Sequence, residues 1–504
     1  MNSTTENPLN SAFFGHPKGL QTLFFTEMWE RMSYYGMRGI LVLFLTATLN
    51  DGGMGMTEAV AFAIYGIYTA SVYFMGLPGG WIADRLLGAQ RAIWYGGIVI
   101  MLGHIVLAIP NDSTFFIGLI LVVLGTGLLK PNIGATVGQL YTLEDKRRDS
   151  GYAIYYMGIN VGSVIGYTVC GYLMNINWHY AFGAAAVGMA IGLFQYRASI
   201  GNLNGVGEKP TAALTPKGNS RAWQIILAFL ALVVVITGLI MKGTLTIDPI
   251  ALAEKVALVF TAMFFIYFAL VYFRGNLNAV EKKGMGALLL VCIASACFWS
   301  GFEQAGSSLN VFTRDFTDRM LGSFEIPTTW FQNANPTFII LLTPFFAWLW
   351  INLGKRMTTP GYGIKCAIGL MIMGSGFLVM IFAAQIAAGG GKAPAFLLIL
   401  TYFLHTVGEL WLSPIALSAV SKLSPRRFAG QMMGVFVLTY SIGNIIAGLM
   451  AGGFDSSQVD QLPNLFQFIA TFTIGAGAVI LLISMYTKNW ETEVEHSHAD
   501  AQAE

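Results

Sequence analysis

Long apolar runs constrain this chain more than any other feature of its sequence. Runs of about 18 or more residues recur along nearly the whole chain, and each is long enough to cross the roughly 30 Å hydrocarbon layer of a membrane as a helix. A membrane β-barrel would instead show stretches of about 10 residues in which apolar and polar residues alternate. Because 55% of the residues are hydrophobic and only 11% are charged, little of the surface suits water. The sequence therefore predicts an all-α integral membrane protein.

Fourteen membrane helices account for these runs. The first six, which form a predicted N-terminal bundle over 21–197, are expected at 21–47, 57–83, 92–110, 114–140, 151–174 and 178–197. A linker over 198–286 is expected to contain two additional helices, at 221–241 and 252–273. The last six, which form a C-terminal bundle over 287–486, are expected at 287–310, 329–351, 363–386, 395–420, 427–452 and 464–486. An N-terminal segment (1–20) and a hydrophilic tail (487–504) flank them.

The distribution of basic residues supports this number of helices. Twenty of the 28 Lys and Arg residues fall in alternate loops, five lie on the opposite side and three lie within the membrane. Basic residues gather on the cytoplasmic side of membrane proteins. Both termini are therefore predicted to be cytoplasmic. The first 20 residues lack the apolar core of a cleavable signal peptide, so the first helix is expected to direct insertion.

The first predicted helix contains an unusual concentration of charge. At 3.6 residues per turn, spacings of four, three and four place its polar residues on one face. The stripe consists of Glu27, Arg31, Tyr34 and Arg38, with Glu30 and Tyr35 beside it. An ionised side chain in the middle of a bilayer costs at least roughly 2.5 to 3.5 kcal/mol, so this face cannot contact lipid. A static ion pair that locks the helix is the alternative to a transport role.

Three further ionisable residues lie in predicted membrane helices. Lys130 precedes Pro131 in the fourth helix and needs an anionic partner, unless it reaches the interface by snorkelling. Glu303 and Glu409 lie in the seventh and tenth helices of the two bundles. The buried set contains four acids and three bases, so one acid lacks a partner. A lone buried carboxyl is a plausible proton carrier. His405, one turn from Glu409, is the alternative carrier.

Several motifs resemble the proton-dependent oligopeptide transporter family of the major facilitator superfamily. EMWERMSYYG is similar to the ExxER motif of that family, with Met32 where Phe is usual. GGWIADRLLGAQR is similar to the superfamily's loop motif, and YYMGINVGS and ELWLSP are similar to the signatures of helices five and ten. The resemblance implies a major facilitator fold with two six-helix bundles and two extra helices. It also implies proton-driven import of di- and tripeptides by alternating access.

The resemblance also implies roles for particular residues. Glu27, Glu30 and Arg31 resemble the proton-coupling group, with Glu303 as the partner of Arg31. Lys130 and Glu409 resemble a pair that crosses between bundles, with Lys130 near the peptide carboxylate and Glu409 near the peptide amino group. The other positions that match the binding pocket are Arg38, Tyr35, Tyr73, Asn160, Asn335 and Ser413. In a membrane this arrangement would separate a proton switch from a peptide clamp.

The expected partners are di- and tripeptides, protons and the lipid bilayer of a bacterial inner membrane, with the proton as coupling ion and no cofactor, metal or nucleic acid. The protein is expected to act as a monomer. The nearest alternative is a related proton-coupled importer of another small solute, such as nitrate or amino-acid derivatives. The chain shows no zinc-spaced histidines, paired catalytic aspartates or nucleophile motif, so an enzyme is not predicted. A channel would differ from a transporter by failing to accumulate solute against a gradient.

Overall fold

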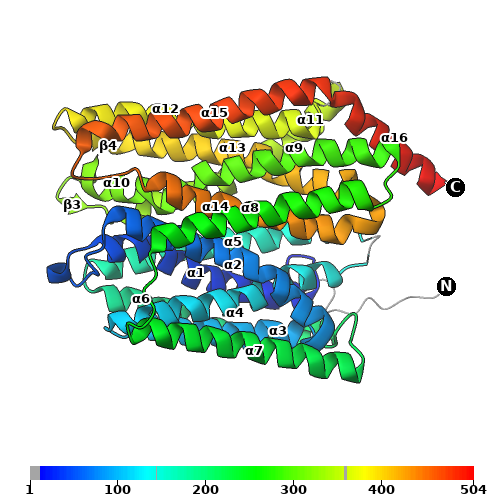
Figure 1. Ribbon diagram of the computed structural model, residues 1–504, viewed down its shortest axis with the longest axis horizontal. Helices are drawn as coiled ribbons and strands as arrows, with labels where there is room; N and C mark the ends of the chain where they lie inside the picture. Colours follow the sequence, from blue (N-terminus) through cyan, green and yellow to red (C-terminus); the bar gives the residue numbers. More distant parts are fainter. Residues whose placement is uncertain (1–11, 143–144, 357–359, 504) are drawn as a thin grey trace. The chain divides into compact units, whose positions relative to one another are not determined.

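The structure is a computed structural model that describes residues 12–142, 145–356 and 360–503, and most of it is helical (Figure 1). Residues 1–11 of the predicted N-terminal segment and residue 504 of the predicted tail lie outside the described residues. The chain divides into two compact units. Unit 1 comprises Met1–Leu41 and Phe74–Asp248, and unit 2 comprises Val42–Tyr73 and Pro249–Glu504. Two of the three unit boundaries fall inside the first two helices, and the third follows Asp248. The predicted limits of the two six-helix bundles stay predictions.

The first eight long helices begin and end close to the predicted positions. They are α1 (Lys18–Thr46), α2 (Glu58–Ile82), α3 (Ala89–Leu107), α4 (Asp112–Gln139), α5 (Arg148–Met174), α6 (Trp178–Ser199), α7 (Pro216–Met241) and α8 (Pro249–Arg274). A π-helical turn, Ala83–Leu87, extends α2. The third helix ends at Leu107 rather than at 110, before Asn111 accepts hydrogen bonds from two backbone amides as the N-cap of α4.

The later elements all belong to unit 2. They are α9 (Ala279–Phe302), α10 (Ser308–Phe316), α11 (Ala334–Arg356), α12 (Tyr362–Ala388), α13 (Ala395–Leu423), α14 (Ala429–Ala451), α15 (Leu462–Tyr486) and α16 (Lys488–Ala503). The loops of this unit contain two pairs of short strands. Strand β1 (Thr317–Asp318) pairs in parallel with β4 (Ala393–Pro394), and β2 (Met320–Leu321) pairs antiparallel with β3 (Phe324–Glu325).

Two predictions about the second half were wrong in detail. The segment 287–310 is not one helix, because α9 ends at Phe302 and a 3-10 turn, Glu303–Gly306, precedes α10. The first residues of the predicted helix 329–351 form a separate 3-10 turn, Thr328–Asn333. The hydrophilic tail, for which no secondary structure was predicted, is helical, as α16. Local polarity did not reveal these features because neighbouring helices fix each of them.

The helices have the length and composition of membrane spans. Among the described residues, 11 helical segments are both long and apolar enough to cross a membrane. Helices α1, α6 and α11, with 29, 22 and 23 residues, are also long enough at 1.5 Å per residue. Helix α1 is less apolar because it contains the charged stripe. The structure is therefore that of a multi-pass membrane protein.

Small residues let the helices pack closely within each unit. In unit 1, α3 lies along α4, and a Cβ added at Gly96 would meet the Gly125 carbonyl oxygen at 2.8 Å. In unit 2, α12 packs along both α13 and α15, and a Cβ at Gly369 would meet the Gly408 oxygen at 2.8 Å. Lipid provides no hydrophobic drive between helices, so such close backbone contacts supply much of the packing energy.

Candidate functional site

The charged stripe on α1 forms a buried ion cluster. Glu27, Glu30 and Arg31 are almost completely enclosed. The Arg31 guanidinium donates to both carboxylate oxygens of Glu30, in a two-point contact, and its Nε lies 3.5 Å from Glu27 Oε1. A two-point contact of this kind fixes the geometry of the guanidinium as well as neutralising a charge. One arginine therefore compensates two carboxylates on adjacent turns.

Aromatic rings complete the surroundings of the arginines on α1. The Arg31 guanidinium carbon lies 4.6 Å from the centre of the Tyr34 ring and 5.7 Å from that of Tyr35. The Arg38 guanidinium carbon lies 5.6 Å from the centre of the same Tyr35 ring. A cation over an aromatic face is attracted by the ring quadrupole. Tyr35, predicted as a binding residue, is thus shared between two guanidinium groups.

Helix α5 positions this cluster by approaching α1 closely. Gly158 and Gly162 are one turn apart, and both face α1. A Cβ at Gly158 would meet the Phe24 ring at 2.9 Å, and one at Gly162 would lie 3.0 Å from the Arg31 Cβ. The YYMGINVGS motif therefore supplies a glycine surface against which α1 packs. Asn160 of the same motif is buried and donates to the Tyr156 carbonyl oxygen at 2.9 Å within its own helix.

Lys130 joins this cluster from α4. Its Nζ donates to Glu27 Oε1 at 3.1 Å, while the Lys130 side chain remains 34% exposed and Glu27 is fully buried. Tyr155 of α5 also lies against the Glu27 carboxylate. Sequence reasoning assigned Lys130 to a peptide clamp separate from the proton switch. The structure instead connects Lys130 directly to Glu27, and its predicted pairing with Glu409 stays a prediction.

Glu303 lies at the interruption of the predicted helix 287–310, between α9 and α10. It follows the last residue of α9, is buried, and accepts a hydrogen bond at 3.3 Å from the Tyr65 hydroxyl on α2. A Cβ at Gly306 would clash with that hydroxyl, so the glycine makes room for Tyr65. Tyr65 appeared in the sequence only as one of several tyrosines on the second helix. No local signal identifies it as a partner of Glu303, whose predicted pairing with Arg31 also stays a prediction.

Glu409 on α13 has an uncharged partner. Asn335, at the start of α11, donates to Glu409 Oε2 at 2.9 Å and to Thr406 Oγ1 at 3.0 Å. Among the described residues, no Lys, Arg or His nitrogen lies within salt-bridge distance of the Glu409 carboxylate. Thr406 precedes Glu409 by three residues on the same helix face, and this spacing is the sequence signal that could have identified it. The structure thus brings together Asn335 and Glu409 but supplies no resident cation.

Three other predicted residues have different surroundings. The buried Ser413 hydroxyl, one turn beyond Glu409, has no hydrogen-bond partner among the described residues. Tyr73 stacks on Tyr440 with ring centres 5.5 Å apart. Both ring nitrogens of His405 are buried without hydrogen-bond partners in the described part of the chain, and aromatic rings of Phe302 and Phe377 lie beside it. A charged imidazole there would be uncompensated, which makes His405 a poorer proton carrier than the carboxylates.

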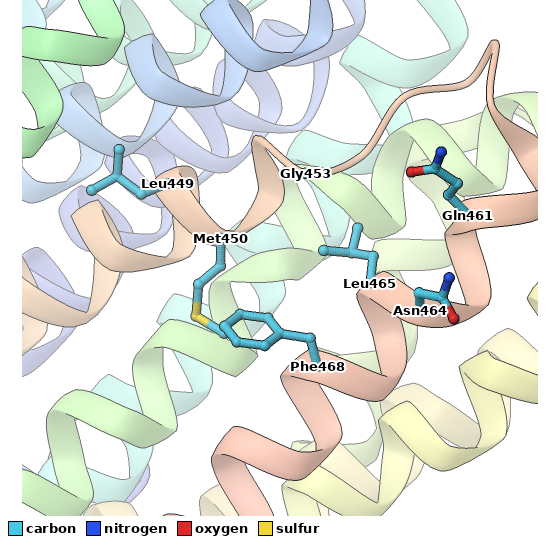
Figure 2. Close-up of a pocket in the computed structure, with 7 residues that line it drawn as sticks. All are labelled: Leu449, Met450, Gly453, Gln461, Asn464, Leu465 and Phe468. Carbon is cyan, nitrogen blue, oxygen red and sulfur yellow. The ribbon is translucent and has the colours of Figure 1, made fainter.

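A groove near the end of α14 contains none of these residues. It has a volume of about 540 Å³ and lies between the last turn of α14 and the first turns of α15 (Figure 2). Met450 and Phe468 point toward each other across it, whereas the amides of Gln461 and Asn464 lie to one side. Its walls supply no ionisable group, so it is a poor candidate for the transport site.

The membrane-spanning helices and their buried ion cluster define a multi-pass membrane transporter. A model of the POT family matches residues 90–469. The chain is 41% identical to the peptide transporter YePEPT of Yersinia enterocolitica over 500 residues, which cover 96% of this chain and 97% of the relative. It is 36% identical to a di-/tripeptide transporter of Lactococcus lactis subsp. cremoris, with 95% and 97% covered. The chain therefore belongs to the POT family, whose members are transporters rather than enzymes.

The fold agrees with this assignment. A crystal structure of a variant of the peptide transporter POT, in complex with alafosfalin, matches with a TM-score of 0.88 and 38% identity. The match covers 95% of this chain and 98% of that chain. The chain accordingly has the major facilitator fold that the sequence motifs predicted.

Proposed function

We propose that this chain is a proton-coupled symporter that imports di- and tripeptides across the bacterial inner membrane by alternating access. It acts as a monomer, with both termini in the cytoplasm. The peptide specificity named for the relatives in Yersinia and Lactococcus supports this substrate class. The observation that carries the proposal is the contact between Lys130 and Glu27, because it connects a cation suited to a peptide carboxylate with a buried acid.

Protonation of Glu27 would release Lys130. While Glu27 is ionised, its Oε1 atom holds the Lys130 ammonium at 3.1 Å. A proton on Glu27 removes that attraction, and the partly exposed lysine is then available to bind the carboxylate of a peptide. By linkage, a peptide that occupies Lys130 in turn favours protonation of Glu27. Arg31 and Glu30 keep the rest of the cluster in place, and Glu303 is the proposed fourth member of the proton-coupling group.

Glu409 is the proposed partner of the peptide amino group. Its carboxylate is held by the Asn335 amide, so a substrate ammonium would supply the cation that the described residues lack. The two charged ends of a short peptide have a nearly fixed separation, and one cation and one anion can therefore select for length. Arg38, Tyr35, Tyr73, Asn160 and Ser413 are the proposed remaining pocket residues.

Uptake by proteoliposomes tests the proposal. A labelled dipeptide should accumulate when the outside is acidic, and unlabelled di- and tripeptides should compete with it, whereas free amino acids and nitrate should not. Uptake that ignores the imposed pH gradient would contradict proton coupling. Competition by nitrate without competition by dipeptides would contradict the substrate class.

Two variants test the assigned roles. Glu27→Gln, which cannot take up or release the coupling proton, should abolish accumulation driven by the gradient but retain exchange of labelled for unlabelled peptide, since exchange needs no net proton movement. Glu254→Gln, an exposed acid on α8, is the matched control and should behave as wild type. Lys130→Ala should weaken peptide binding, and unaltered uptake by this variant would count against its role at the peptide carboxylate.

A further inference from the structure

A second groove in unit 2 lies between α8 and α9. It is near Arg274 at the end of α8 and near Lys282 and Lys283 in the first turns of α9. It has a volume of about 610 Å³, within the roughly 300–1,000 Å³ of typical small-molecule sites. Helix α8 contributes one aromatic wall, α9 the opposite wall and α16 one end. The aromatic wall consists of Phe265, Phe268, Tyr272 and Phe273. Phe273 is 76% exposed and Phe265 is 48% exposed, so the wall is apolar and open.

The groove is a built feature, because α16 is fixed in place at several points. A Cβ at Gly286 of α9 would lie 2.8 Å from the Trp490 ring, so the glycine provides the seat for that ring. Val494, one turn further along α16, is buried. From the other side of α16, Glu491 accepts hydrogen bonds from the backbone amides of Tyr362 and Gly363 at the start of α12, at 2.6 and 3.1 Å. These amides are otherwise without helical partners.

The rim of the groove is positively charged. Lys283 Nζ forms an ion pair with Glu493 Oε2 at 2.6 Å. Lys282 is exposed, and its Nζ lies 5.8 Å from the centre of the Tyr272 ring. No carboxylate among the described residues lies within salt-bridge distance of Lys282. Glu281, the nearest acid in sequence, caps α9 and pairs with Arg427 at 3.4 Å.

We propose that this groove binds an anionic phospholipid. One acyl chain lies along the aromatic wall of α8, and the phosphate of the head group binds at Lys282. An apolar, open wall suits a hydrocarbon chain. Basic pockets between membrane helices on the cytoplasmic side attract anionic head groups, and the positive-inside rule assigns this end of unit 2 to that side. Trp490 lies at the same level, where tryptophans commonly mark the membrane interface.

The proposed site assigns α8 a role in lipid binding. Helix α8 is one of the two helices that the sequence adds to the twelve of the predicted bundles, and few of its residues are buried. A phospholipid in the groove would contact α8, α9 and Trp490 together. Bound lipid would therefore stabilise the arrangement of these three helices, since anything that binds only the folded state raises its stability.

Lipid binding to the full-length protein tests the proposal without measuring transport. Purified protein is mixed with phosphatidylglycerol or with phosphatidylcholine of the same acyl chains, and retained lipid is counted by native mass spectrometry while thermal unfolding is followed. Phosphatidylglycerol should be retained and should raise the melting temperature, and phosphatidylcholine should do neither. Equal effects of the two lipids would overturn the proposal, as would an equal shift caused by inorganic phosphate alone.

Two variants separate the head-group contact from the acyl-chain contact. Lys282→Glu should weaken binding of phosphatidylglycerol about tenfold, because it reverses a charge next to the phosphate. Lys255→Glu makes the same charge change at the other, exposed end of α8 and should have no effect. Ala269→Trp fills the groove and should reduce retention even though the rim charges are intact. Retention of phosphatidylglycerol by both Lys282→Glu and Ala269→Trp at the wild-type level would exclude this groove as the site.

Discussion

The two units bury carboxylates in different ways. In unit 1, Glu27 and Glu30 share two cations, Arg31 and Lys130, within the same group of helices. In unit 2, the Glu409 carboxylate is held by the uncharged Asn335 amide. A proton on a buried carboxylate with resident cations releases one of those cations, whereas a carboxylate with a neutral partner can accept a substrate ammonium. The first arrangement suits a switch, and the second suits a binding site.

Arg31→Ala should break the unit 1 arrangement most severely. Removing the guanidinium leaves Glu30 without its two-point partner in a fully buried site, and such losses cost about 3–5 kcal/mol. The variant should express poorly, and thermal unfolding of the purified protein should show a lower melting temperature. Arg91→Ala, which removes an exposed arginine from α3 of the same unit, is the control. A melting temperature of Arg31→Ala equal to that of the control would mean that the cluster contributes nothing to the fold.

Glu409→Gln should affect binding rather than folding. The Gln amide oxygen can still accept from Asn335, and no resident cation loses its partner, so stability should change by less than about 1 kcal/mol. Affinity for a dipeptide should fall about 10- to 100-fold, because a charge-assisted hydrogen bond to its ammonium is lost. Binding of an N-acetylated dipeptide should be unaffected by the substitution. Equal loss for both ligands would place the amino group elsewhere.

Gly162→Ala should disturb the support of the unit 1 cluster without removing a charge. The added methyl would press on the Met28 carbonyl and lie 3.0 Å from the Arg31 Cβ, which forces α1 away from α5. Overpacking of this kind typically costs about 1–3 kcal/mol. Gly183→Ala is the matched control, since its Cβ would lie 3.9 Å from that of Ala108, an ordinary contact. If the two variants unfold at the same temperature, the glycine surface of α5 does not position α1.

Tyr65→Phe should have the smallest effect. It removes the hydrogen bond to Glu303 and leaves the packing of the ring, so the free energy of unfolding should fall by about 0.5–1.5 kcal/mol. Tyr486→Phe, at an exposed position of α15, is the control. A loss of 3 kcal/mol or more in Tyr65→Phe, on the order of that for a broken buried ion pair, would mean that Glu303 depends on Tyr65 as Glu30 depends on Arg31.

Much of the fold was predictable from the sequence, and less of the candidate site. Most helices that cross the membrane begin and end within about five residues of their predicted limits. The exceptions are α9, which begins at Ala279 rather than at 287, the break at Glu303 and the 3-10 turn before α11. The charged face of α1 followed from spacing alone. The contact between Lys130 and Glu27 did not, because those residues are 103 positions apart and meet only when α1 and α4 pack. The capping of α12 by Glu491, 128 residues after Gly363, is similar.

The sequence by itself determined that the chain forms membrane helices and that one of them contains charges that cannot face lipid. These properties are local, because the transfer free energy of a side chain and the 3.6-residue period depend only on the segment concerned. The tertiary structure decided which charged groups pair with one another and where the predicted helix 287–310 is interrupted. It also decided that α16 closes one end of an apolar groove. Those outcomes depend on contacts between segments distant in sequence, whose energies exist only once the helices have packed.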